Sequence, residues 1–322
     1  MVPSVAPAAA PPVAYEEVPC PLCHGTDVVC KLEDRGARTA NRAALMACTS
    51  LDHGVFGRIV QCRRCGLQFR SPREDEATIL GWYADVEDPV YLSQEPARVD
   101  TFAAALRRLE RRVPVRGPLV DLGCYTGVFL DVAAKQGWKV TGVEPSRWAG
   151  DVARRRGYEV YSGTVATAPL PRNAYAVVTS WDVVEHLADP VRELELAREV
   201  ARDDGWLVVS TIDVDAWIVR LLGRRWPWYM RMHLVYFTRK TLTAVLARAG
   251  WKVVAIETYP HVVTMGYLAR KLAAYSPRLS SWLAALLRGL RLADRHISID
   301  LGDCITAYAV KAPVADAVPP AA

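Results

Sequence analysis

Short apolar runs alternate with amphipathic segments from about residue 117 towards the end of the chain. The runs are rich in valine and isoleucine and only a few residues long, which is typical of buried strands. They are PLVDLG, WKVTGVE, YEVYSG, AVVTSW, GWLVVSTI, WKVVAIETY and CITAYAVK. The segments between the first five, for example GVFLDVAAKQG and PVRELELAREVARDDG, have the spacing of amphipathic helices. This alternation predicts an α/β fold with a doubly wound, mostly parallel sheet.

Two helical insertions interrupt the alternation, at about residues 214–233 and 264–300. The second contains a helix with a leucine face beside an arginine stripe. These residues are Leu283, Leu286, Leu287 and Leu290, and Arg288, Arg291 and Arg295. Three interpretations stay open. The segment is a helical pair that covers the core, a substrate lid whose arginines meet a phosphate or diphosphate, or an interfacial helix on an anionic membrane.

The charge of the chain is uneven. The net charge is +5, yet Glu257 and Asp294 are the only acidic residues between Trp217 and Ile297, a region rich in Lys and Arg. Such asymmetry indicates an anionic partner on the C-terminal side. The N-terminal MVPSVAPAAAPPVAYEEV lacks the basic and apolar regions of a signal peptide, and no apolar run reaches the roughly 18 residues of a spanning helix. We expect a cytoplasmic protein, associated with a membrane only at its inner face.

With 322 residues, the chain is long enough for one large domain and a smaller module. Disordered tails are expected at residues 1–17 and 314–322 because these stretches are rich in Pro and Ala. A cysteine-bracketed module is expected at residues 18–70, a helical linker or lid at 71–116, and the α/β domain at 117–313.

Four of the eight cysteines form two C-x-x-C pairs, Cys20 with Cys23 and Cys62 with Cys65. A C-x-x-C turn directs both sulfurs to one point, and two such turns complete a tetrahedral thiolate shell for zinc. All four ligands would be protein groups, so the site is expected to be structural. The alternative is four ordinary free cysteines.

The segment VDLGCYTGVFLDVA predicts a ligand-binding turn. Asp121 closes a strand, Gly123 and Gly127 flank the bend, and a helix follows. Glycines let the backbone approach a ligand closely, and a helix N-terminus favours negative charge. Glu144 ends the next strand, where a carboxylate can accept both hydroxyls of a ribose. These groups are expected at the carboxyl edge of the sheet, the binding edge of open α/β folds.

The order of these motifs resembles class I S-adenosylmethionine-dependent methyltransferases. The motifs are D-x-G-x-x-x-G, G-V-E-P-S, WDVVEHLADP and DDGWLVVST. The likeness extends over residues 117–258, is greatest to ubiquinone-type O-methyltransferases, and makes residues 304–311 the expected final antiparallel strand. A four-cysteine zinc module joined to such a core is also similar to bacterial sugar C-methyltransferases. The resemblance implies a Rossmann-like class I methyltransferase sheet and S-adenosylmethionine as the cofactor.

The resemblance also implies which residues bind the cofactor. By this resemblance, Asp121, Gly123 and Gly127 lie at the methionine end of the cofactor, and Glu144 holds the ribose. Thr164 and Val165 lie by the adenine, and Trp181 lines the methyl-donor pocket. Tyr125 stands where the family often has glycine, and it either caps the cofactor or packs outward. A nicotinamide cofactor is the alternative for such a turn, but the G-x-G-x-x-G motif is missing.

Methyl transfer to a hydroxyl or a carbon acid also needs a base. His186, in VVEH, and His233, in RMHLVYF, are the candidate catalytic residues. The sugar C-methyltransferases that the chain resembles have a Glu-His pair at the second position, whereas Met232 precedes His233 here. Each histidine has a structural alternative, at a helix start or in a packing turn. Glu185 and Tyr83 are further candidates.

The predicted function is S-adenosylmethionine-dependent methylation of a small-molecule or glycan acceptor, at an oxygen of a sugar or lipid-linked saccharide. The basic C-terminal helices suggest a phosphorylated or lipid-linked acceptor and peripheral membrane contact. C-methylation of a nucleotide-linked keto-sugar is an alternative. An RNA or protein modifier and a non-catalytic scaffold are alternatives from other classes. Nucleic acid is disfavoured because basic residues of the cysteine module are offset by Glu33, Asp34 and Asp52.

Overall fold

The structure is a computed structural model, and it describes residues 14–36, 46–49 and 54–312. Most of the two predicted tails, residues 1–13 and 314–322, lies outside the described residues. The end of the first tail is ordered, unlike the prediction. The backbone N–H groups of Glu16 and Arg73 each donate to the carbonyl of the other at 2.9 Å, and Glu17 forms an ion pair with Arg58.

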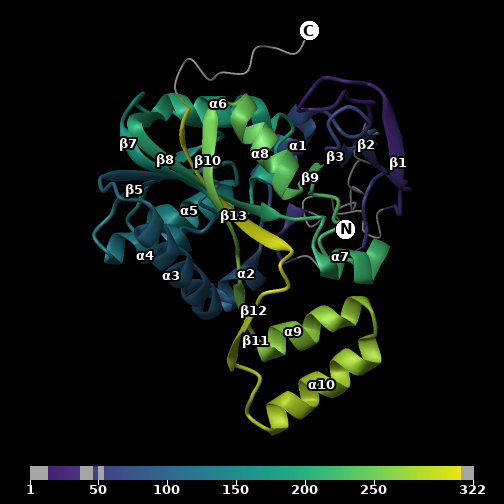
Figure 1. Cartoon of the computed structure of the whole chain (residues 1–322). Helices are drawn as coiled ribbons and strands as arrows, with labels where there is room; N and C mark the ends of the chain where they lie inside the picture. The colour runs from purple at the N-terminus through teal and green to yellow at the C-terminus, as the bar shows by residue number, and fades with distance from the viewer. Residues whose placement is uncertain (1–13, 37–45, 50–53, 313–322) are drawn as a thin grey trace, which may run out of the picture.

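A seven-stranded sheet forms the centre of the molecule (Figure 1). Its strands, in spatial order, are β10 (Trp251–Thr258), β13 (Cys304–Lys311), β8 (Ala201–Ile212), β7 (Tyr175–Ser180), β4 (Pro118–Leu122), β5 (Lys139–Glu144) and β6 (Glu159–Ser162). The five strands from β8 to β6 are parallel, whereas β13 is antiparallel to both of its neighbours. The predicted fold class is confirmed, including the antiparallel strand at residues 304–311.

Both faces of this sheet are buried, which explains why its strands read as continuous apolar runs. Val178 of β7 and Val209 of β8 join one core with residues of α6 (Pro190–Val200) and α8 (Arg239–Arg248). The neighbouring Val177 and Val208 join the opposite core with residues of α3 (Glu95–Arg112) and α4 (Val128–Lys135). Successive side chains of a strand point to opposite faces, so each valine pair serves both cores. Helix α5 (Arg147–Arg155) connects β5 to β6.

One predicted boundary was wrong. The helix expected to continue through residue 205 ends at Val200, and β8 begins at Ala201. Ala201 pairs with Tyr175 of β7, and its dihedral angles, φ −69° and ψ 144°, are extended. The ARDDG stretch therefore extends the strand rather than the helix.

The cysteine module is built into the α/β domain rather than appended to it. Its sheet contains β1 (Val28–Leu32), β2 (Ile59–Cys62) and β3 (Gln68–Arg70), and β9 (Val235–Tyr236) of the α/β domain pairs with β3. The buried carboxylate of Glu74 forms ion pairs with the buried side chains of Arg70 and Arg231. Since charges taken out of water need partners, this cluster fixes the module against the segment that precedes β9.

The predicted helical linker at residues 71–116 contains α1 (Glu76–Ala84), α2 (Pro89–Ser93) and α3. The first predicted insertion forms α7 (Trp217–Leu222) and the 3-10 turn η3 (Gly223–Arg225). Within the described residues, no helix is sufficiently long and apolar to span a bilayer.

The second predicted insertion is more complex than a helical pair. A two-stranded sheet, β11 (His261–Thr264) and β12 (His296–Ile299), carries α9 (Met265–Lys271), η4 (Leu272–Ala274) and α10 (Pro277–Gly289) away from the main sheet (Figure 1). Because α10 ends at Gly289, Arg291 and Arg295 lie beyond it, and the predicted arginine stripe is not one helical face. Of the four predicted leucines, only Leu287 is buried, so the pair does not cover the core.

Candidate active site

The turn after β4 has the backbone geometry that its glycines predict. Gly123 and Gly127 both have φ of +78°, a conformation that favours glycine. The N–H groups of Gly123 and Cys124 donate to the carbonyl of Val143 at 2.8 and 3.1 Å, which ties the turn to β5. Gly127 then caps the start of α4. These contacts hold the turn at the carboxyl ends of the parallel strands β4 and β5.

Asp121 and Gly127 shape this turn but do not line the cavity beside it. Asp121 is buried and accepts a hydrogen bond from the Thr179 hydroxyl at 2.6 Å, and burial raises its pKa to about 8. A Cβ atom on Gly127 would lie 2.9 Å from the Cβ of Ala153. These two residues act behind the cavity wall, whereas the sequence predicted direct contact with a cofactor.

Glu144 lies at the carboxyl end of β5 and faces the turn. Its two carboxylate oxygens accept the backbone N–H groups of Tyr125 at 2.8 Å and Ser146 at 2.7 Å. Burial raises the pKa of Glu144 to about 7, although both hydrogen bonds act in the opposite direction. A carboxylate oxygen has two acceptor sites, so each oxygen can accept one further hydroxyl. The residue lines the cavity and fits the predicted contact with a ribose.

Tyr125 lines the same cavity and packs against its aromatic wall. Its ring meets the ring of Tyr91 at 4.5 Å and that of Trp148 at 6.2 Å, and its hydroxyl donates to Asp88 at 3.4 Å. Its φ of +47° is uncommon for a residue with a side chain. Of the two predicted placements, the structure therefore favours the one at the cavity.

The other predicted cofactor residues lie around one cavity of about 520 Å³, a size typical of small-molecule sites. Thr164 and Val165 follow β6, and Trp181 follows β7. The Trp181 ring packs against Phe129 at 5.0 Å and Tyr259 at 5.6 Å. Its indole nitrogen is buried and has no hydrogen-bond partner among the described residues. A donor in this position can serve a bound ligand.

The two predicted catalytic histidines meet at the cavity. His186 lies in the 3-10 turn η2 (Val184–His186) and His233 precedes β9, yet their ring centroids are 4.8 Å apart. The Nδ1 of His233 is 2.7 Å from the carbonyl of Trp228. Because a carbonyl only accepts, Nδ1 of His233 is assigned as the donor in this contact.

His186 is half-buried whereas His233 is buried, and loss of hydration lowers the pKa of His186 to about 4. Its Nδ1 is 2.7 Å from the Tyr83 hydroxyl and 3.1 Å from the carbonyl of Met232. Glu185 accepts from the Thr211 hydroxyl at 2.8 Å, and burial raises its pKa to about 8. His186 is therefore neutral and weakly basic near neutral pH, and Glu185 largely keeps its proton.

A third histidine of the cavity was not predicted. The Nε2 of His261, on β11, is 3.3 Å from the carboxylate of Asp182, which also accepts from the Ser210 hydroxyl at 2.6 Å. Burial alone would raise the pKa of Asp182, but His261 and Ser210 keep it below the usual value. Asp182 stands in the WDVVEH motif, but His261 follows it by 79 residues and belongs to no motif.

Arg98 on α3 is a second unpredicted residue of the cavity wall. Its guanidinium carbon lies 3.6 Å from the centre of the Tyr91 ring, and its Nε is buried without a hydrogen-bond partner among the described residues. The sequence showed it only as one cation of an amphipathic helix. The arginines predicted to meet a phosphate, Arg288, Arg291 and Arg295, do not line the cavity.

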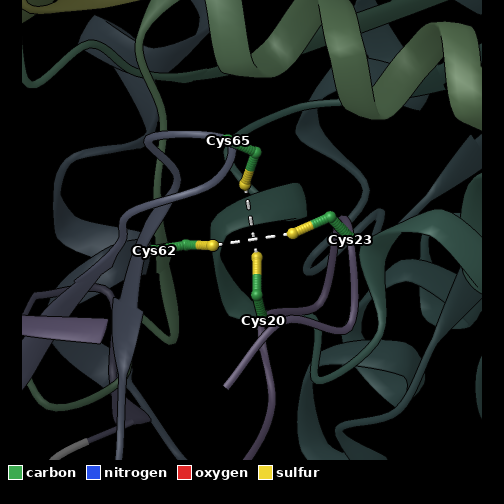
Figure 2. A group of neighbouring side chains, drawn as sticks. All are labelled: Cys20, Cys23, Cys62 and Cys65. Carbon is green, nitrogen blue, oxygen red and sulfur yellow. Dashed lines mark hydrogen bonds between the residues drawn. The ribbon is translucent and has the colours of Figure 1, made fainter. Parts of the chain in front are cut away.

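The four predicted metal ligands converge on one point (Figure 2). The Sγ atoms of Cys20 and Cys65 are 3.4 Å apart, those of Cys23 and Cys62 are 3.5 Å apart, and all four lie within 4.8 Å of one another. A disulfide would bring two sulfurs to about 2.05 Å, whereas Zn–S bonds of about 2.3 Å place tetrahedral ligands about 3.8 Å apart. The spacing fits a four-thiolate zinc site.

Together, the sheet order, the glycine turn and the carboxylate at the end of β5 define an α/β protein with a ligand-sized cavity at the carboxyl edge of its sheet. A family model described as "Methyltransferase domain" matches residues 92–256, which is about half of the chain. The protein therefore belongs to this methyltransferase family.

Curated relatives with similar sequences include ubiquinone biosynthesis O-methyltransferases. That of Nitrosospira multiformis is 31% identical over 103 residues, covering 30% of this chain and 43% of the relative. That of Caulobacter sp. is 33% identical over 121 residues, covering 34% and 48%. The chain thus spans about half the length of these relatives.

Solved structures with a similar arrangement include a SAM-dependent methyltransferase from Archaeoglobus fulgidus, with a TM-score of 0.48 and 18% identity, covering 70% of this chain and all of that one. Geranyl diphosphate C-methyltransferase from Streptomyces coelicolor has a TM-score of 0.43 and 14% identity, covering 65% and 77%. Likeness at this level carries no conclusion about function.

The turn geometry leads to a prediction for Gly123→Ala. A Cβ atom there would lie 2.5 Å from a methyl group of Val183, at a φ of +78°. We expect stability to fall by about 1–3 kcal/mol and S-adenosylmethionine binding to weaken, measured by thermal unfolding and calorimetry. Gly137→Ala is the matched control, because Gly137 has a φ of +82° but open space around it. Equal losses in both variants would attribute the effect to backbone strain alone.

Proposed function

We propose that the protein transfers the methyl group of S-adenosylmethionine to a hydroxyl group of an acceptor with a large apolar part. The observation that carries this proposal is the placement of Glu144, the Gly123 turn and His261 around one cavity. The family match to a methyltransferase domain and the naming of relatives as O-methyltransferases support it.

The residues present fit the cofactor. Glu144 would accept the ribose hydroxyls, the backbone of Gly123 to Tyr125 would lie along the methionine end, and Thr164 with Val165 would pack on the adenine. The guanidinium of Arg98 would meet the methionine carboxylate, because it is a cation on the same cavity wall as Tyr91 and Tyr125.

Bound S-adenosylmethionine supplies an electrophilic methyl group, so the protein has to align the acceptor, exclude water and remove one proton. We assign the base to His261. Asp182 accepts the Nε2 proton of its neutral ring, leaves Nδ1 to take the proton of the acceptor hydroxyl, and stabilises the imidazolium that forms. Burial lowers the pKa of His186 to about 4, so His186 is a weak base near neutral pH. His186 and His233 would instead shape the wall beside the acceptor.

The lining of the cavity favours an apolar acceptor. Most of the lining surface is apolar, and it includes the aromatic and sulfur-containing side chains of Tyr83, Trp181, Trp228, Met230, Tyr259 and Tyr267. A free sugar would leave most of its hydroxyls without partners in such surroundings. An aromatic or isoprenoid acceptor with one hydroxyl fits better. The sugar or lipid-linked saccharide stays a prediction, and C-methylation remains the alternative outcome.

The four cysteines would hold zinc as a structural ion. Cys20 and Cys62 are buried and belong to the core that also contains Leu234, which follows His233, and Val235 of β9. Zinc would therefore stabilise the wall of the cavity without contacting the acceptor.

The test is a methyl-transfer assay with a panel of hydroxylated prenylphenols and glycosides, scored by mass spectrometry of the product. With an accepted substrate, His261→Ala and Asp182→Asn are expected to lower kcat by about 10²–10⁴-fold, while S-adenosylmethionine affinity stays close to that of the wild type.

His296→Ala is the matched control. His296 lies on β12, the strand that pairs with β11, and its Nδ1 is 2.6 Å from the carboxylate of Asp100. Unlike His261, His296 lies outside the cavity. If His261→Ala kept full activity and His233→Ala lost it, the base would instead belong to the predicted pair, His186 and His233. A product methylated at carbon would contradict the hydroxyl acceptor and favour C-methylation of a keto-sugar.

A further inference from the structure

The α9–α10 hairpin, defined as residues 264–295, presents an apolar stripe to solvent. Leu279, Trp282, Leu286 and Leu290 recur at helical spacing and are 49%, 61%, 41% and 58% exposed. Only Ser280 and Leu287 of α10 are buried. A contiguous exposed stripe of this kind marks an interaction surface more often than isolated surface leucines do.

The surroundings of the stripe are strongly basic. Residues 264–295 contain one acidic residue, Asp294, and six cations, Arg270, Lys271, Arg278, Arg288, Arg291 and Arg295. Among the described residues, none of these five arginines forms an ion pair with a carboxylate, whereas many arginines of the α/β domain do. A basic rim around apolar side chains complements an anionic lipid surface.

The hairpin is continuous with the cavity of the active site. Tyr267, Leu268, Lys271, Leu272 and Tyr275 line that cavity from α9 and the turn that follows it. Leu268 is itself 39% exposed and Tyr275 is 50% exposed, so they belong to both the cavity wall and the outer surface. An apolar chain seated on the hairpin would reach the acceptor site without crossing water.

We propose that the α9–α10 hairpin docks on an anionic phospholipid bilayer, and that the acceptor enters the cavity from that bilayer as an amphipathic lipid. The proposal rests on the proposed methyl transfer for the role of the acceptor, but the docking itself does not need catalysis. With 13 residues, α10 is shorter than the roughly 20 residues needed to cross a bilayer, so it lies in the interface with Trp282 and the leucines inserted.

The experiment is sedimentation of the full chain with phosphatidylcholine vesicles and with vesicles of equal parts phosphatidylcholine and phosphatidylglycerol. We expect binding to the mixed vesicles that weakens with added salt. Trp282→Ser combined with Leu286→Ser should lower the partition coefficient about tenfold or more, and Arg288→Gln combined with Arg291→Gln should do so on the order of tenfold. Val254→Ser is the control, because Val254 is 52% exposed on β10.

Absence of vesicle binding by the wild type, or equal binding to both vesicle types, would overturn the proposal. So would a dimer in light scattering that Trp282→Ser with Leu286→Ser dissociates, because the stripe would then be covered by a second copy of the chain. Calorimetry with S-adenosylmethionine on the same preparations separates the two proposals. Cofactor binding without vesicle binding refutes the docking alone, and the reverse refutes the methyl transfer alone.

Discussion

Glu144→Ala is expected to weaken S-adenosylmethionine binding on the order of a hundredfold, because two hydrogen bonds from ribose hydroxyls to a charged acceptor are lost. The same carboxylate also holds the N–H groups of Tyr125 and Ser146, so the turn itself will loosen. Isothermal titration calorimetry measures the affinity, and thermal unfolding measures the effect on the fold. Glu144→Gln helps to separate the two effects, since the amide keeps one oxygen for a backbone N–H.

The raised pKa of Glu144 gives this prediction a pH dependence with opposite signs for stability and binding. A buried carboxyl with a pKa of about 7 holds its proton in the folded state after the unfolded chain has lost it. The unfolding free energy of the free protein therefore falls as pH rises from about 4.5 to 7. Cofactor binding should strengthen over the same window, because the ionised carboxylate accepts both hydroxyls.

The control for both measurements is Glu159→Ala. Glu159 is an exposed carboxylate on the neighbouring strand β6, bonded only to Thr141 and Tyr161 in the described residues, and it lies outside the cavity. If Glu144→Ala bound S-adenosylmethionine with wild-type affinity, and if wild-type binding did not strengthen from about pH 4.5 to 7, Glu144 would not be the ribose contact.

Cys62→Ser is expected to abolish zinc binding and to destabilise the whole fold by several kcal/mol, since binding energy of a structural zinc ion is folding energy. The effect should not stay within the module, because Cys62 and Cys20 share a core with Val235 and Phe237 of the α/β domain. Thermal unfolding should show a Tm lower by about 10 °C or more, in one transition. Metal analysis should find close to one zinc ion per wild-type chain and none in the variant.

Cys30→Ser is the matched control for this loss. Cys30 lies on β1 of the same module, but it is exposed and its thiol contacts only Glu33 among the described residues. Its variant should keep both the metal and the Tm. Metal-free wild-type protein with full stability, or a Cys62→Ser variant that retains zinc, would show that the four sulfurs cluster without an ion.

The main sheet could be predicted because both of its faces are buried. Strands such as AVVTSW and GWLVVSTI must then be apolar throughout, and their runs stand out in the sequence. The short strands β9, β11 and β12 carry two to four residues each and give no such signal. The cysteine cluster was predictable for a different reason, because its ligands lie in two local turns whose spacing is set by tetrahedral coordination.

What could not be predicted depends on contacts between distant segments. An amphipathic pattern showed that α10 has a leucine face, but not whether protein or solvent covers it. Asp182 and His261 are separated by 79 residues, and their approach requires the β11–β12 stem to fold over the cavity. The same holds for Arg98, which is one of several cations on α3 and becomes distinct only through its place on Tyr91.

The pairing of β3 with β9 bears on how such enzymes can be recombined. The carbonyl of Leu234 accepts the N–H of Arg70, and the N–H of Leu234 donates to the carbonyl of Glu185, so one residue next to His233 connects the cysteine module to the turn that carries His186. A chimera that exchanges the first seventy residues between homologues would therefore also alter the acceptor wall. To preserve the acceptor wall, an exchange would have to include both the cysteine module and β9, although the two are far apart in the sequence.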